Sequence, residues 1–68
     1  MIDLTKYQYI DNEVTIICND GDELTGRISA VEDEEESGLN EIGIALFCND
    51  GRYIGIGQSE IKEIIIHE

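Results

Sequence analysis

Positive charge is scarce in this sequence. Its 68 residues include four lysines and arginines against sixteen aspartates and glutamates, so the formal net charge is -12 at pH 7. A surface with this charge repels nucleic-acid phosphates and anionic membranes at long range, and it attracts cations and basic proteins. The composition therefore disfavours a general nucleic-acid binder or a membrane-surface protein, and it favours a basic protein as partner.

Residues that bind metals or carry redox chemistry are equally few. The two cysteines, Cys18 and Cys48, lie thirty residues apart, and the single histidine, His67, has no cysteine at ligand spacing. These positions fit neither a zinc site nor a disulfide-dense scaffold. The run from Asn19 to Glu23 lacks the distal glutamate of a calcium loop, and the sequence has no glycine-rich phosphate loop. We therefore expect no metal and no cofactor, and we interpret both cysteines as small core residues.

The chain also lacks long apolar runs. None of its apolar stretches reaches the length of a signal peptide or of a membrane span. Together with the low cysteine content, this absence predicts an intracellular, cytoplasmic protein in a reducing compartment. The length predicts one domain, and a domain of this size buries only about 60% of the surface that its unfolded chain exposes. Association between copies would therefore add stability.

What the sequence does contain is a tetrapeptide that occurs twice. Cys18-Asn19-Asp20-Gly21 recurs as Cys48-Asn49-Asp50-Gly51, and each copy follows a run of apolar residues. Asp-Gly between two alternating segments is a strong hairpin signal, because glycine adopts the positive φ angle of a tight primed turn without steric cost. The sequence therefore predicts two β-hairpins with primed turns.

Alternation of apolar and polar residues extends the β pattern over most of the chain. Gly26 falls on the inward face of the second segment, where a glycine permits the sharp bend that a small closed barrel needs. We expect an all-β fold, a small five-stranded, strongly bent antiparallel barrel over residues 13–68. Its strands are expected over 13–19, 23–30, 41–48, 52–57 and 61–67.

The N-terminal segment, residues 1–12, has a different pattern. Asp3 is a candidate helix cap, and Leu4, Tyr7 and Ile10 follow it at helix-like spacing. A helix this short does not stand alone in water, so it needs packing against the rest of the protein. We expect a short helix that covers an open end of the barrel and is held there by Leu4 and Tyr7.

Apolar side chains exceed what one small barrel can bury. Ile64, Ile65 and Ile66 follow one another, so neither face of the last strand is polar, and Phe47 adds an apolar residue to the second face of the third strand. Exposed strand edges with apolar flanks invite pairing with other chains. We therefore predict a homo-oligomer joined through the fourth and fifth strands.

Several expected features occur together from Glu13 onward: a bent second strand, a variable loop before the third strand and a short turn before the fifth strand. They are accompanied by a series of glycine, apolar and polar residues: Asp20-Gly21, Leu24, Gly26, Ile28 and Val31, followed by Leu39-Asn40, Ile42 and Ile44. Over most of the chain this arrangement resembles the Sm-like (LSM) small β-barrel family, and the residue series is similar to the first Sm motif. The turn before the fifth strand and Ile61 to Ile64 look like a divergent second Sm motif.

The resemblance implies ring assembly through strands four and five and RNA binding at a pore, with Asn40 as the base-contacting residue. Leu39, however, offers no aromatic face for base stacking, and Ile56 stands where an arginine is expected before Gly57. With few cations, the release of counterions that supplies most nucleic-acid affinity is nearly absent. The RNA-binding alternative therefore needs a local positive site, formed by Arg27, Arg52 and Lys62 through ring symmetry.

A weaker likeness, of type rather than of motif, connects the chain with the small acidic barrel that inhibits the transcription terminator Rho. That protein turns a negative surface against a nucleic-acid-binding protein. The interpretation we favour is accordingly a non-enzymatic Sm-like module that associates with itself and binds a basic protein through its acidic surface. The alternative is an RNA-binding Sm-like ring protein, and an enzyme is a third hypothesis.

The densest acidic segment is a run of five carboxylates. It could bind a basic protein partner or a divalent cation, or it could only keep a loop solvated. We expect an exposed loop because packing would bring like charges together. Carboxylates in one shared wet loop do not acquire the different pKa values of a catalytic acid and base, so we expect no enzyme. The five residues are Glu32, Asp33, Glu34, Glu35 and Glu36.

Overall fold

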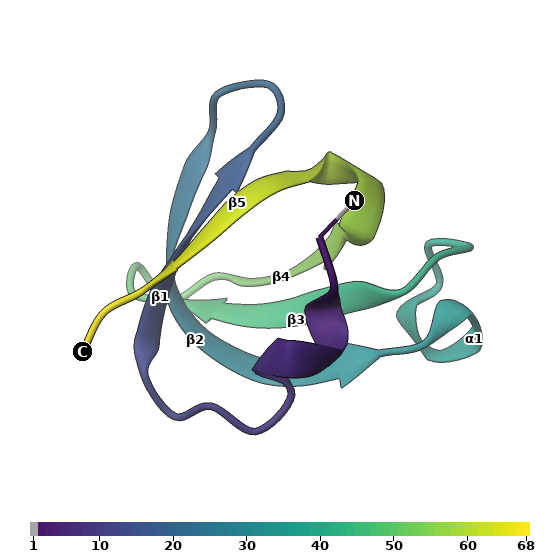
Figure 1. Cartoon of the computed structure of the whole chain (residues 1–68), viewed down its shortest axis with the longest axis horizontal. Coiled ribbons are helices and arrows are strands. Elements are labelled where there is room, and N and C mark those ends of the chain that lie inside the picture. The colour runs from purple at the N-terminus through teal and green to yellow at the C-terminus, as the bar shows by residue number, and fades with distance from the viewer. Residues whose placement is uncertain (1) are drawn as a thin grey trace.

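The computed structural model describes residues 2–68. In this part of the chain, five β-strands and three short helical segments follow one another (Figure 1). They are η1 (Leu4–Tyr7), β1 (Glu13–Cys18), β2 (Glu23–Glu32), α1 (Glu34–Ser37), β3 (Gly43–Cys48), β4 (Tyr53–Gly57), η2 (Gln58–Glu60) and β5 (Ile61–Ile66).

The strands form one antiparallel sheet in the order β4-β3-β2-β1-β5. The long strand β2 pairs with β1 along its first half and with β3 along its second half, with Gly26 in both ladders. The sheet therefore bends sharply at β2 (Figure 1). The predicted all-β fold, a strongly bent five-stranded antiparallel barrel with an N-terminal helical turn, is confirmed. β4 and β5 are its two edge strands, and the barrel is open between them.

Both repeated tetrapeptides form hairpin loops, but the predicted primed turns were wrong. In each loop the glycine amide donates to the cysteine carbonyl at 3.0 Å. Gly21 and Gly51 have φ angles of 96° and 95°, whereas Asp20 and Asp50 do not have positive φ. This geometry is a three-residue loop, a type I turn followed by a left-handed glycine. The aspartate side chain favours it, because Asp20 Oδ1 accepts from the Asp22 amide and Asp50 Oδ1 from the Arg52 amide, both at 3.0 Å.

The acidic run is exposed at Asp33 to Glu36, as predicted, but it is not a plain loop. Glu32 ends β2, and Glu34–Ser37 forms the single helical turn α1. Asp33 caps this turn by accepting hydrogen bonds from the Glu35 and Glu36 amides at 3.0 and 2.9 Å. The expectation was wrong because the free amides of a first helical turn favour acidic side chains, which here point into solvent.

The core lies inside the bent sheet and is closed by η1. Leu4 is fully buried and Tyr7 packs partly buried against the core, so the predicted role of the N-terminal segment as a cover is confirmed. Cys48 is a buried core residue, whereas Cys18 is only half-buried. The largest fully buried side chains are Leu4, Val14, Ile16, Ile44 and Leu46.

Candidate functional site

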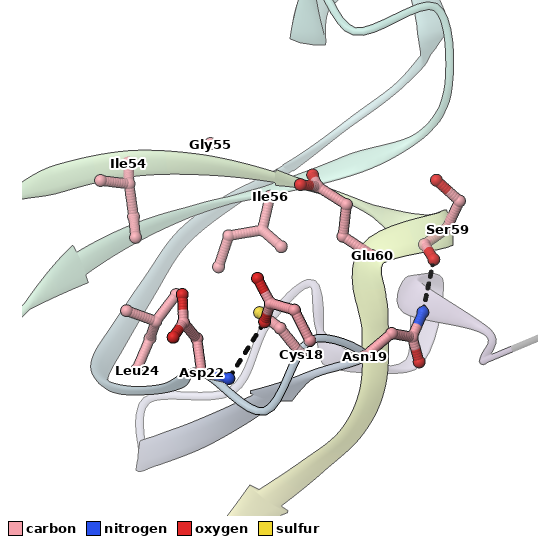
Figure 2. A pocket seen from close by; sticks show the side chains of 10 residues that line it. Cys18, Asn19, Asp22, Leu24, Ile54, Gly55, Ile56, Ser59 and Glu60 are labelled. Atoms are coloured by element: carbon pink, nitrogen blue, oxygen red, sulfur yellow. Dashed lines mark hydrogen bonds between the residues drawn. The ribbon is translucent and has the colours of Figure 1, made fainter.

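A groove opens where the barrel is not closed, between the inner face of β4 and the β1–β2 hairpin. Its volume is about 500 Å³. In Figure 2 the side chains of Ile54 and Ile56 point from β4 toward Leu24 and Cys18 on the opposite wall. Leu24 and Ile54 are partly buried, so this apolar floor remains accessible. The lining residues are Cys18, Asn19, Asp20, Asp22, Leu24, Ile54, Gly55, Ile56, Ser59 and Glu60.

Three carboxylates form an acidic rim around this apolar floor: Asp20, Asp22 and Glu60. The first two belong to the β1–β2 loop, and Glu60 ends η2. No basic side chain is among the groove's lining residues in the described chain, 2–68. The rim therefore concentrates negative charge that no residue of the groove neutralises, beside apolar surface that a partner could cover.

The two walls of the groove are fixed to one another by Asn19. Its backbone amide donates to the Glu60 carbonyl at 2.9 Å, and its side-chain amide donates to the Ser59 carbonyl at 2.8 Å. The repeated residue Asn49 does the same for the second hairpin, with bonds to the Thr25 carbonyl at 3.0 Å and to a Glu13 carboxylate oxygen at 2.8 Å. Both asparagines of the repeat thus attach a hairpin loop to a neighbouring segment.

The thiol of Cys18 lies at the groove but is poorly suited to nucleophilic chemistry. Burial, followed by the negative charges of Asp20, Glu60 and Asp22, raises its pKa above the ordinary cysteine value. The reactive form of a cysteine is the thiolate, which a raised pKa makes rarer at neutral pH. The single histidine does not assist, because His67 Nε2 is hydrogen-bonded to Thr15 Oγ1 at 2.7 Å, away from the groove lining. The groove is therefore better suited to binding than to covalent catalysis.

The free edge of β4 borders the groove. The Arg52 carbonyl accepts a hydrogen bond from the last residue of β3 at 2.8 Å. Backbone groups alternate in direction along an antiparallel strand, so those of Ile54 and Ile56 also face β3. The backbone groups of Tyr53 and Gly55 consequently point away from the sheet and have no strand partner in the order β4-β3-β2-β1-β5.

The outer face of β3 and β4 carries two exposed aromatic side chains. Phe47 and Tyr53 are 55% and 60% exposed, and their rings meet edge to face at 6.3 Å. The Tyr53 hydroxyl donates to Ser29 Oγ at 3.0 Å, so the ring crosses β3 to reach β2. Arg27 lies directly across from Phe47 in the β2–β3 ladder. The sequence placed Phe47 on the second face of its strand, and the structure agrees.

The four residues predicted for RNA binding lie on four different segments. Asn40 is exposed before β3 with a left-handed φ of 62°, and Lys62 is exposed on β5. Arg27 lies on β2, where its guanidinium donates to the Asp11 carbonyl. Arg52 forms an ion pair of 2.7 Å with Asp50, whose pKa is lowered by the hydrogen bonds from the Arg52 backbone and side chain. Of these four residues, Arg27 lies beside the Phe47 and Tyr53 pair, because it is paired with Phe47 in the β2–β3 ladder.

The five residues of the acidic run, Glu32 to Glu36, do not line the groove. The chain therefore presents two separate acidic surfaces, the run around α1 and the rim of the groove. Sequence reasoning found the first because its charges are consecutive, and it missed the second. Asp22 and Glu60 are far apart in sequence, and their segments are brought together by the β1–β5 pairing, in which Cys18 lies opposite Ile61, and by the bonds from Asn19.

Comparison with protein-family models, with curated proteins and with solved structures found no match. Within residues 2–68, no three or more histidine, cysteine, aspartate or glutamate residues are grouped so that they could hold a metal ion. The helical segments of the same residues are also too short to span a membrane.

Proposed function

We propose that this chain is a non-enzymatic Sm-like module that binds a basic protein through its acidic surface and associates with copies of itself through β4 and β5. The observation that carries the proposal is the groove, in which an apolar floor, three rim carboxylates and an unpaired strand edge lie together. Apolar contact supplies affinity, and uncompensated charge selects partners of the opposite sign and speeds their encounter. The raised pKa of Cys18 disfavours a nucleophilic role for this thiol.

Affinity capture from a cell lysate tests the proposed class of partner. We expect the tagged chain to retain basic proteins at about 50 mM salt and to release them as the salt approaches about 300 mM, because screening weakens exposed charge pairs. The same proteins are expected in a nuclease-treated lysate, which serves as the control. Retention of nucleic acid alone, or loss of every bound protein after nuclease treatment, would contradict the proposal.

One observation favours the RNA-binding alternative. Arg27 lies across from Phe47, and Phe47 and Tyr53 present exposed rings on which bases could stack. The alternative has less support, because Arg27 and Arg52 are already engaged with Asp11 and Asp50. It requires single-stranded RNA to be retained on a filter at low salt, with a shallow salt dependence that reflects few phosphate contacts. No retention at low salt would end it.

Self-association is supported by the second free edge. The His67 amide donates to the Glu13 carbonyl at 2.9 Å, so alternation directs the backbone groups of Ile64 and Ile66 away from β1. Ile65 and Ile66 are each 39% exposed beside this edge. The edges of β4 and β5 therefore offer complementary backbone donors and acceptors with apolar flanks, which favour pairing between copies.

We expect sedimentation equilibrium at micromolar concentration to give a mass above that of one chain. The apparent mass should rise with salt, because two copies of charge -12 repel each other. Salt should therefore strengthen self-association, whereas it should weaken binding of a basic partner. Ile66→Pro should raise the dissociation constant of self-association at least tenfold. The substitution removes a backbone amide that points to the free edge of β5 and not to β1.

The matched control is Ile66→Val, which keeps that amide and a β-branched side chain. Circular dichroism verifies that both variants remain folded. A strictly monomeric mass for the unmodified chain at every salt concentration would contradict self-association.

A further inference from the structure

We propose that the groove binds an extended segment of the basic partner, which adds to the free edge of β4 as an antiparallel strand. In this arrangement one aliphatic side chain of the segment covers the apolar floor, and lysines or arginines two positions before and after it meet the acidic rim. The inference rests on the proposed function, because it names the kind of segment that the same groove accepts.

The exposed edge of β4 determines the backbone contacts. The amides and carbonyls of Tyr53 and Gly55 point away from the sheet, so one added strand can bond to them. The edge does not extend further, because the Gly57 amide donates to Glu60 Oε2 at 2.9 Å. The docked segment is therefore short, and a single aliphatic residue lies opposite the centre of this edge.

The floor and the rim determine the side chains. Residues of an added strand alternate between the two faces of the sheet, so every second side chain continues the inner row formed by Ile54 and Ile56 and points toward Leu24. Inward side chains two positions apart are separated by about 7 Å. With the aliphatic residue opposite Ile54, one flanking cation lies opposite Ile56 on the side of Glu60. The other lies opposite Arg52, whose charge Asp50 already neutralises, and its long side chain extends across the groove toward Asp20 and Asp22. Glu60 lies at the Gly57 end, and Asp20 and Asp22 belong to the β1–β2 loop on the opposite wall.

Charge favours a foreign segment over a second copy in the groove. The β5 edge of another copy would bring one cation, Lys62, followed directly by Glu63, on a chain of net charge -12. A segment with basic residues on both sides of its aliphatic residue neutralises the rim without adding negative charge. The preferred pattern is therefore Lys or Arg, any residue, Val or Ile, any residue, Lys or Arg.

The direct test is titration of the chain with the synthetic peptide acetyl-Thr-Lys-Thr-Val-Thr-Lys-Thr-amide. We expect saturable binding in the micromolar to millimolar range, with amide shifts in NMR spectra centred on Tyr53 and Gly55. The peptide should also slow alkylation of Cys18, while buried Cys48 stays unreactive with or without peptide. A peptide with glutamate in place of lysine should bind at least tenfold more weakly.

Backbone methylation of the peptide tests strand addition itself. In an antiparallel pair, opposite residues share a face of the sheet, so the two threonines flanking valine direct their amides toward Tyr53 and Gly55. N-methylation of these threonines should abolish binding. N-methylation of the valine and of one lysine is the matched control, because their amides face solvent, and it should change affinity by less than about threefold. Equal effects of the two modifications would overturn the proposed strand addition.

Charge neutralisation of the protein tests the rim. The triple variant D20N/D22N/E60Q keeps the side-chain acceptors for the Asp22 and Gly57 amides, and it should bind the lysine peptide roughly tenfold more weakly, as expected for a few exposed ion pairs. The control E34Q/E35Q/E36Q also changes the net charge from -12 to -9, but away from the groove, and should retain affinity.

The possible results separate this inference from the proposed function. One result would overturn the groove inference: E34Q/E35Q/E36Q no longer captures basic proteins, whereas D20N/D22N/E60Q captures them as before. Binding of a basic protein through the acidic run would then remain supported. Equal peptide affinity in both triple variants would likewise overturn the groove inference. Capture of no basic protein, together with normal peptide binding, would contradict the proposed function. The groove would then still be a binding site for an extended basic segment, but not for a segment of a basic protein in the lysate.

Discussion

Gly26→Ala should destabilise the protein by more than about 3 kcal/mol. A Cβ atom on residue 26 would lie 2.7 Å from Cys48 Cα and 2.8 Å from the Phe47 carbonyl carbon, and it would also overlap the Phe47 carbonyl oxygen. These are backbone atoms of β3, so relief requires β2 and β3 to separate. Gly26 pairs with both Val14 and Cys48, which means that the separation disrupts the sheet where it bends.

The expected loss exceeds about 3 kcal/mol, compared with a total of roughly 3–10 kcal/mol for a chain of this length. Urea denaturation followed by circular dichroism measures it. Gly55→Ala is the control, because the atom nearest to its added Cβ is Leu39 Cδ1 at 4.0 Å, and it should change stability by less than about 1 kcal/mol. A Gly26→Ala variant with a cooperative transition close to that of the unmodified chain would contradict the assigned β2–β3 approach.

The sequence predicted the place of Gly26 in the bend but not the closeness of the two backbones. Alternation and turn residues are local signals, and they were sufficient for five strands, two hairpins and a buried Leu4. The approach of β3 to Gly26 depends on pairing with Cys48, which is distant in sequence. In a strand sequence, a glycine that permits a bend cannot be distinguished from a glycine that permits close approach of a neighbouring backbone.

Strand ends were misplaced for a related reason. The third strand was predicted from residue 41, yet Glu41 precedes β3 and its carboxylate accepts bonds from the Ser59 amide and hydroxyl at 2.7 and 2.6 Å. Ser37 Oγ also donates to the Glu41 carbonyl at 2.7 Å. Glu41 thus connects the loop before β3 to η2. No local sequence pattern indicates that Glu41 bonds to Ser59, because an acidic residue before an apolar run is also typical of the start of a strand.

The groove could not be predicted either, although the sequence indicated one residue of its floor and the loop that carries two of its rim carboxylates. The alternating pattern placed Leu24 on an inward face, and the repeat marked the loop that holds Asp20 and Asp22. What the sequence does not contain is the gap between the edge strands, which arises because β4 and β5 are not paired. The site is therefore a property of an incomplete barrel, and its floor consists of core residues that the sheet leaves uncovered.

The two proposed interactions of β4 exclude one another at a single edge. A strand from the basic partner and β5 of a second copy would bond to the same backbone groups of Tyr53 and Gly55. Salt should weaken the first interaction and strengthen the second, because the first would join opposite charges and the second like charges. Low salt and a basic partner should therefore favour the single chain with its groove occupied, and high salt should favour association between copies.

Leu4→Ala is expected to have the second largest effect, a loss of about 2–5 kcal/mol of stability. Leu4 has 0% exposure although it lies on η1, a segment of four residues. A segment this short is not stable alone, so the burial of Leu4 largely determines whether the N-terminal cover stays in place. The other attachments of the N-terminal segment include the bond from the Gln58 side-chain amide to the Ile2 carbonyl at 2.6 Å and the partly buried Tyr7 and Ile10.

Urea denaturation measures this loss, and limited proteolysis shows where it acts. Cleavage after Lys6 or Tyr7 should accelerate before the rest of the chain becomes sensitive, because η1 would leave the core first. Tyr9→Ala is the matched control, since Tyr9 lies just after η1 and is 89% exposed, so that its removal should change stability by less than about 0.5 kcal/mol. Equal stability of the Leu4→Ala and Tyr9→Ala variants would show that the barrel holds its core without the cover, and it would contradict the packing assigned to η1.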